Sequence, residues 1–215
     1  MSLPDCKANC RYHNRHADLW CDHGVNCPIF LLFAFSVLRR NCLASFTKQE
    51  IEEQSPIWNL FQNGGVVLFR KPAILDEATN NLTRNGYRVH AIDCSHCTDE
   101  PSALFAIVDS LKIPRYQRIG LDGFNDLIRQ IEFDGSTGVV VVLIAFHRFW
   151  QAFPKYACHI LDIMANHHRS QLLVGNRLLI LAQSEDPGID EQIGIVGGYK
   201  PIWNSAEWLR KNRDL

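Results

Sequence analysis

Val139-Val140-Val141-Val142-Leu143-Ile144-Ala145-Phe146 is an unbroken apolar run of the length of one strand. A short continuous run rich in β-branched residues is typical of a strand that is buried on both of its faces, as in the interior of a parallel sheet. Three weaker strand patterns accompany it, at residues 66–69, 87–93 and 177–182. The second of these alternates in polarity, and the first follows the turn residues Asn63-Gly64-Gly65.

Helical patterns separate the strand patterns along the chain. Apolar residues recur at spacings of three and four over residues 74–85, where Gly86 ends the run, and over residues 100–111, 121–131 and 154–168. Strands that alternate with helices form parallel sheets with right-handed crossovers. The sequence therefore predicts an α/β fold with a small parallel β-sheet of three to four strands packed with helices.

The chain divides into a predicted extension, residues 1–55, and a domain, residues 56–215. Seven residues of types that bind zinc crowd the beginning of the extension: Cys6, Cys10, His13, His16, Cys21, His23 and Cys27. Their spacing matches no known finger or ribbon, so we assign no metal and no cofactor, and metal binding stays the alternative. The extension also contains an apolar run at residues 28–38, which predicts a short packed helix.

Composition limits the partners of the protein. With 215 residues the chain is long enough for one core, and a net charge of −1 indicates no basic field for wrapping nucleic acid. The apolar run at residues 28–38 is shorter than the roughly 20 residues of a membrane span. Because the first two dozen residues are polar and unlike a signal peptide, we expect a cytoplasmic protein whose eight cysteines are reduced.

The segment around residues 114–131 carries the most distinctive pattern. Asp122 and Asp126 are four residues apart, so they lie one turn apart on the exposed side of the predicted helix. Arg118 and Arg129 are at helical spacing from these aspartates, and two local salt bridges would explain all four residues without any partner. On spacing alone this local explanation stays open.

Two neighbouring features point instead to a protein interface. Tyr116 follows Pro114 on the connection into the helix, and tyrosine is a side chain that interfaces favour. Gly123 lies between the aspartates, where glycine destabilises a helix by roughly 1 kcal/mol relative to alanine. A bare backbone at that position would let a partner approach closely. We therefore predict a partner-binding site formed by Tyr116, Arg118, Asp122, Gly123 and Asp126.

From residue 58 onward several short segments follow one another in a distinctive order: Asn85-Gly86-Tyr87, Ala91-Ile92-Asp93, Leu104-Phe105-Ala106, Ile113-Pro114-Arg115-Tyr116, the helix at 121–131, the strand at 139–144, Gln183-Ser184-Glu185-Asp186-Pro187 and Trp203-Asn204-Ser205-Ala206-Glu207-Trp208. In this order they resemble the barstar family of intracellular ribonuclease inhibitors, and the flanks are similar to the longer bacterial members. None of these segments is a catalytic signature.

The resemblance implies a function. In barstar a loop tyrosine and two helix aspartates enter the ribonuclease active site, which implies that Tyr116, Asp122 and Asp126 do so here. The expected partner is a ribonuclease or a related nuclease toxin, with no direct nucleic-acid binding. The family usually has glycine and asparagine in the loop, whereas this chain has Gln117-Arg118-Ile119-Gly120. A cation at Arg118 weakens attraction to a basic cleft or selects another partner, such as the toxins that immunity-type members face.

Other functions remain as alternatives. Cys94-Ser95-His96-Cys97 follows a strand and precedes a helix, the setting of a thiol–disulfide oxidoreductase. The chain could also be a protein-binding module of the same fold that inhibits no ribonuclease. The sequence contains no HExxH motif, no phosphate-binding loop and no nucleophile elbow. We therefore expect the protein not to be an enzyme.

Overall fold

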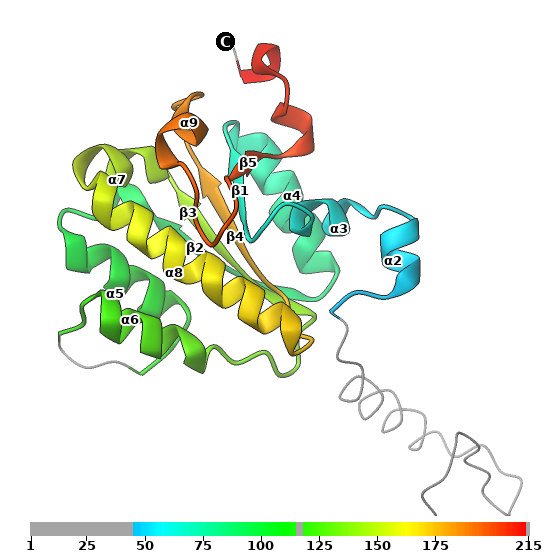
Figure 1. Cartoon of the computed structure of the whole chain (residues 1–215), viewed down its shortest axis with the longest axis horizontal. Helices are drawn as coiled ribbons and strands as arrows, with labels where there is room; N and C mark the ends of the chain where they lie inside the picture. Colours follow the sequence, from blue (N-terminus) through cyan, green and yellow to red (C-terminus); the bar gives the residue numbers. More distant parts are fainter. Residues whose placement is uncertain (1–44, 115–117, 214–215) are drawn as a thin grey trace, which may run out of the picture. The chain divides into compact units, whose positions relative to one another are not determined.

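The computed structural model describes residues 45–114 and 118–213, and these residues form an α/β domain (Figure 1). Within them, five parallel strands make one sheet in the order β2-β3-β4-β1-β5. The strands are β1 (Val66–Phe69), β2 (Tyr87–Asp93), β3 (Gly138–Ile144), β4 (Leu178–Gln183) and β5 (Ile202–Trp203). The predicted fold class and parallel sheet are confirmed, but the predicted number of three to four strands is wrong.

The strand that the sequence did not reveal is β5. It consists of two residues, and it pairs with β1 through the register Val67↔Ile202 and Leu68↔Trp203. A segment of two residues has no alternation of polarity that could mark it as a strand. Its pairing with β1 depends on a contact between residues that are far apart in the sequence.

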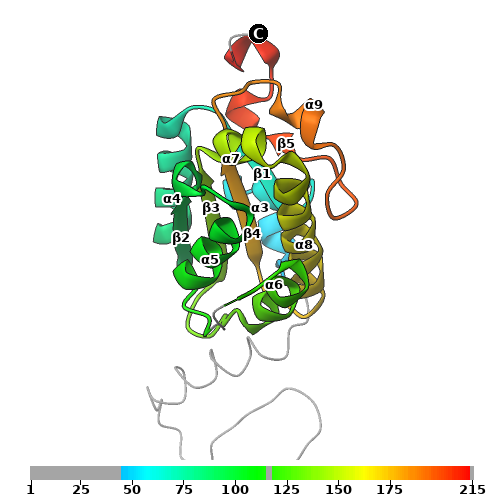
Figure 2. The same cartoon turned by 90° about the vertical axis from the view of Figure 1, so that its left-hand side faces the viewer.

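Helices cover both faces of the sheet (Figures 1 and 2). One face packs against α5 (Glu100–Ser110), α6 (Leu121–Leu127), α7 (Phe146–Ala152), α8 (Pro154–Leu173) and α9 (Ile189–Ile193). The other face packs against α3 (Pro56–Phe61) and α4 (Pro72–Arg84), and α2 (Lys48–Glu52) precedes α3. Four short 3-10 helices complete the described residues: η1 (Cys94–His96), η2 (Ile128–Gln130), η3 (Ser205–Glu207) and η4 (Arg210–Arg213). None of the described helices is both long and apolar enough to cross a membrane.

Strand β3 lies at the centre of the core. Val139, Val141 and Leu143 face the cluster under α5 to α8, whereas Val140 and Val142 face the cluster under α4. Each of these side chains is at most 2% exposed. The prediction that this run is buried on both faces is confirmed for residues 139–143. Its predicted end is wrong, because the strand stops at Ile144, which is 38% exposed, and Phe146 already belongs to α7.

Several helix ends differ from the predicted ones. Helix α4 begins at Pro72 and ends before Asn85, and Gly86 adopts a φ of 81°, as the predicted glycine stop requires. Helix α6 stops at Leu127, and η2 continues it to Gln130 with tighter turns. Helix α8 continues past the predicted end at residue 168 to Leu173, because its apolar packing does not stop there: Leu172 packs against the cluster beneath α4.

Residues 45–50, at the beginning of the described chain, contact Arg177, the residue before β4. Arg177, next to the first residue of β4, donates a hydrogen bond to Glu50 Oε1 at 2.8 Å and to the Ser45 carbonyl oxygen at 2.6 Å. Its guanidinium lies 4.0 Å from the ring centroid of Phe46. The Cys/His-rich stretch and the apolar run of the predicted extension lie outside the described residues, and the division at residue 55 stays a prediction.

Candidate protein-binding site

Helix α6, which carries the two aspartates, is anchored by its buried face. Phe124 is completely buried and Leu127 is 6% exposed, and both pack in the core cluster shared with α5 and α8. Figure 2 shows α6 beside α5 and α8. Burial of a phenylalanine side chain stabilises a fold by about 1.5 to 3 kcal/mol. Ile119, just before the helix, is also buried, and the Phe124 N–H donates to the Gly120 carbonyl oxygen at 2.9 Å. The packing of its buried face therefore fixes the position of α6 and of the residues on its outward face.

The outward face of α6 presents the carboxylates of Asp122 and Asp126, and both residues are exposed. Among residues 45–114 and 118–213, neither carboxylate forms an ion pair or a side-chain hydrogen bond. Such carboxylates are available to cations of a partner.

The local salt bridges that could have explained the aspartates are not formed. Arg118 is exposed and pairs with no acid in the described part of the chain. Arg129 lies near α8, where its charge adds to burial in lowering the pKa of His167. Tyr116, the remaining predicted site residue, lies outside the described residues. The structure thus places Arg118, Asp122, Gly123 and Asp126 on one short segment and leaves Tyr116 a prediction.

Gly123 is not required by packing inside the domain. A Cβ atom built at Gly123 would lie 3.7 Å from Cγ2 of Ile119, which is an ordinary van der Waals contact. Its φ angle is not in the left-handed region that favours glycine. The interior of the domain would therefore accept alanine at this position. We infer that the glycine instead serves a contact on the outer side of the helix.

Polar groups on the neighbouring helix α8 are already engaged. Asp162 accepts the Gly197 N–H at 2.8 Å through Oδ1 and the Asn166 side-chain amide at 3.2 Å through Oδ2. The Arg169 guanidinium donates to the Gly197 carbonyl oxygen at 3.1 Å. These bonds hold the turn at residues 196–199 against α8, so Asp162 differs from the free carboxylates of α6.

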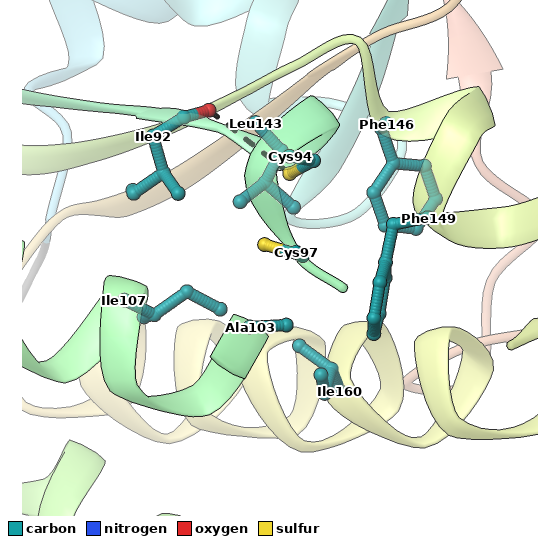
Figure 3. Close-up of a pocket in the computed structure, with 9 residues that line it drawn as sticks. All are labelled: Ile92, Cys94, Cys97, Ala103, Ile107, Leu143, Phe146, Phe149 and Ile160. Carbon is teal, nitrogen blue, oxygen red and sulfur yellow. Dashed lines mark hydrogen bonds between the residues drawn. The ribbon is translucent and has the colours of Figure 1, made fainter. Parts of the chain in front are cut away.

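The alternative site at Cys94 and Cys97 faces inward. Cys94 is 4% and Cys97 8% exposed, and both line a small apolar cavity with Ile107 and Phe149 among its walls (Figure 3). Within residues 45–114 and 118–213, both cysteines thus belong to the buried core and not to the exposed surface. The geometry does not favour an oxidoreductase that acts on protein substrates.

The carboxyl edge of the sheet holds a second surface feature, which the sequence patterns did not reveal. Arg70, Lys71, Pro72 and Glu185 line an open hollow of about 250 Å³ where β1 and β4 end. Beside it, Gln183 accepts the Ala145 N–H at 2.8 Å and donates to the Arg70 carbonyl oxygen at 3.1 Å. The described residues contain no group of three or more His, Cys, Asp or Glu side chains that could hold a metal ion.

Fold and site together define a parallel α/β domain whose short, well-anchored helix α6 presents two exposed carboxylates that pair with no other described residue. Residues 87–181 match the family described as Barstar (barnase inhibitor). This stretch, which runs from β2 into β4 and includes α5 to α8, is barstar-like, so the resemblance inferred from the sequence is confirmed over residues 87–181. For residues 58–86 and 182–215 the resemblance stays a prediction. Strands β1 and β5 and helix α4 lie outside the matched residues.

Comparison with individual proteins adds little. No curated protein matches the sequence. A solved structure, the crystal structure of Cdc6p from Pyrobaculum aerophilum, is similar with a TM-score of 0.42 and 16% sequence identity. The similarity covers 80% of this chain and 49% of that chain, so the present chain spans about half the length of that protein.

Proposed function

We propose that the protein binds a ribonuclease, or a related nuclease toxin, and blocks its active site with α6 and the loop before it. In this proposal Asp122 and Asp126 meet the cations of the nuclease, Tyr116 and Arg118 contact the rim of its cleft, and Gly123 permits close approach. The protein itself performs no catalysis and needs no cofactor. The observation that carries the proposal is the pair of exposed, unpaired carboxylates within a barstar-like domain.

The physical chemistry of a nuclease cleft supports this pairing. Such a cleft holds arginine and lysine side chains that grip phosphate, and a carboxylate offers these cations a substitute anion in charge-assisted hydrogen bonds. Helix α6 presents its carboxylates from a backbone fixed by Phe124 and Leu127. A preorganised surface loses less conformational entropy on binding than a flexible one.

The test is inhibition of a small guanyl-specific ribonuclease by the purified protein and by its Asp126→Ala variant. We expect the variant to bind more weakly by at least about 2 kcal/mol, a magnitude taken from charged hot spots at protein interfaces, barnase–barstar among them. Its free energy of unfolding should stay within about 0.5 kcal/mol of the parent value, because an exposed helix carboxylate contributes little to folding.

Asp76→Ala is the matched control. Asp76 is also an exposed helix aspartate, but it lies on α4, which covers the opposite face of the sheet. Equal weakening by both variants would show a general charge effect and would contradict the proposed site. Absence of inhibition by the parent protein, for this enzyme and for a panel of nuclease toxins, would favour a binding module that inhibits no nuclease.

A further inference from the structure

Cys94 and Cys97 are already held close to the separation that a disulfide requires. They are the first and fourth residues of a turn at the carboxyl end of β2, and the Cys97 N–H donates to the Cys94 carbonyl oxygen at 3.1 Å. A turn closed by such a bond places its first and fourth Cα atoms within about 7 Å, and disulfides span about 4.4 to 6.8 Å. Both thiols are free in the structure.

The two side chains line the same small cavity. The cavity that they line has a volume of about 10 Å³, and its other walls, such as Ile92, Leu143 and Phe146, are apolar (Figure 3). This volume is close to the minimum that holds one water molecule. The cavity gives the thiols room to rotate toward each other and leaves space beside them for a small oxidant.

The two thiols differ in acidity. A hydrogen bond from the Cys94 thiol to the Cys97 sulfur, together with burial, raises the pKa of Cys94. The same bond lowers the pKa of Cys97, assisted by the Ser102 hydroxyl and opposed by burial. The Cys94 thiol also lies 4.0 Å from the Ile92 carbonyl oxygen, a second acceptor for its proton. Cys97 is therefore the more nucleophilic sulfur and Cys94 the one that keeps its proton.

We propose that Cys94 and Cys97 form a redox-active dithiol, which hydrogen peroxide converts into an intramolecular disulfide and which a small thiol restores. The proposal does not depend on nuclease binding. It assigns a modification site to the turn after β2, three residues before α5 begins at Glu100.

The chemistry balances in two steps. The Cys97 thiolate attacks one oxygen of the peroxide, the O–O bond breaks, and the leaving hydroxide takes up a proton to become water, which leaves Cys97 as a sulfenic acid. Cys94 then gives up its proton and attacks the Cys97 sulfur, so that the S–S bond forms, the S–O bond breaks and a second water departs. Two thiols lose two electrons, and the peroxide gains them.

The chain offers a clean readout for this reaction. Trypsin cleaves after Arg88 and after Lys112, and the peptide between these sites contains Cys94 and Cys97 and no other cysteine. The full-length protein is treated with hydrogen peroxide, alkylated with iodoacetamide under denaturing conditions, digested and weighed by mass spectrometry. We expect this peptide to be lighter by two hydrogen atoms and to carry no alkyl group. Reduction with dithiothreitol before alkylation should restore two alkylation sites.

Two variants test the assigned order of attack, and a third serves as a control. In Cys94→Ser, Cys97 should accumulate as a sulfenic acid that dimedone traps, whereas in Cys97→Ser the remaining Cys94 should stay unmodified. Cys158→Ser, which removes a half-buried thiol on α8, should leave disulfide formation unchanged. Absence of the disulfide in the parent protein, oxidation past sulfenic acid without a disulfide, or dimedone labelling of Cys94 in Cys97→Ser would each overturn the proposal.

Discussion

The carboxylate of Glu207 accepts a hydrogen bond of 2.8 Å from the backbone N–H of Arg70, although 137 residues separate the two in the sequence. The same oxygen, Oε2, accepts the side-chain amide of Asn204, and the second oxygen, Oε1, accepts the Lys71 N–H at 2.8 Å. Glu207 is completely buried. The C-terminal segment is thus joined to the backbone between β1 and α4 by a network of charge-assisted hydrogen bonds.

Replacement of Glu207 should strongly destabilise the domain. Glu207→Ala leaves the backbone N–H groups of Arg70 and Lys71 without this acceptor, whereas the Asn204 amide keeps its bond to the Leu68 carbonyl oxygen. Each buried unsatisfied group costs about 1 to 3 kcal/mol. We expect the free energy of unfolding, measured with urea, to fall by about 3 kcal/mol or more. Glu207→Gln keeps one acceptor oxygen and should lose less. A loss below about 1 kcal/mol in the alanine variant would show that water replaces the carboxylate.

Gly123→Ala should separate stability from binding. The added methyl group makes only an ordinary contact with Ile119, and alanine favours a helix, so the free energy of unfolding should rise by about 0.5 to 1 kcal/mol. If a partner approaches the backbone at this position, the same variant should bind the inhibited nuclease more weakly. Thermal unfolding and a binding titration on one preparation measure both quantities. Unchanged affinity would remove Gly123 from the proposed interface.

Arg118→Ala should accelerate association with a basic nuclease. Arg118 is the exposed, unpaired cation on the described segment that leads into α6, and its removal makes this surface more acidic. Electrostatic steering acts on the association rate and is screened by salt. We expect the rate, measured by stopped flow, to rise at low ionic strength and the gain to shrink as salt is added. Arg84→Ala on α4 is the control, and an equal gain there would indicate a net-charge effect.

His168 should make the stability of the domain depend on pH. Burial lowers the pKa of His168, which is 1% exposed and stacks on Phe61 with ring centroids 5.7 Å apart. Below the unfolded-state pKa of about 6.5, the unfolded chain binds a proton at this histidine that the folded chain does not bind. The free energy of unfolding is therefore unaffected by His168 above that pH, and it falls as the pH drops toward the folded-state pKa.

The measurement is the free energy of unfolding from about pH 7.5 down to about pH 5.5, a range chosen around the ordinary histidine pKa. In His168→Gln the free energy of unfolding should change less steeply with pH than in the parent protein. Part of the pH dependence that remains should come from His167, whose pKa is also lowered by burial. His159→Gln, at an exposed position on α8, should keep the parent slope. Identical slopes in the parent and in His168→Gln would contradict the assignment.

Local pattern accounts for much of what could be predicted. The limits of β1 and β2 agree with the sequence pattern, and β3 is buried on both faces up to Leu143, as its composition indicated. The predicted helix at 100–111 is α5, whose capping residue Asp99 accepts the Ser102 N–H at 2.8 Å. These features depend on residues within one or two turns of each other, and so the sequence reveals them directly.

Long-range contacts account for the rest. Helical spacing could not show whether the two aspartates of α6 pair with Arg118 and Arg129. Arg129 belongs to η2, which packs against α8, and its charge acts there on His167. The inward orientation of Cys94 and Cys97 likewise depends on helices that close over the turn after β2.

The sequence by itself determined the α/β class, the parallel sheet and the barstar-like stretch, because periodicity and the order of motifs are properties of the chain. The tertiary structure alone decided that β5 joins β1, that Glu207 binds the backbone before α4, and that the carboxylates of α6 stay unpaired among the described residues. The first two features depend on burial, which brings together groups that are more than one hundred residues apart in the sequence. The third depends on where the packing of the domain places the neighbouring arginine side chains.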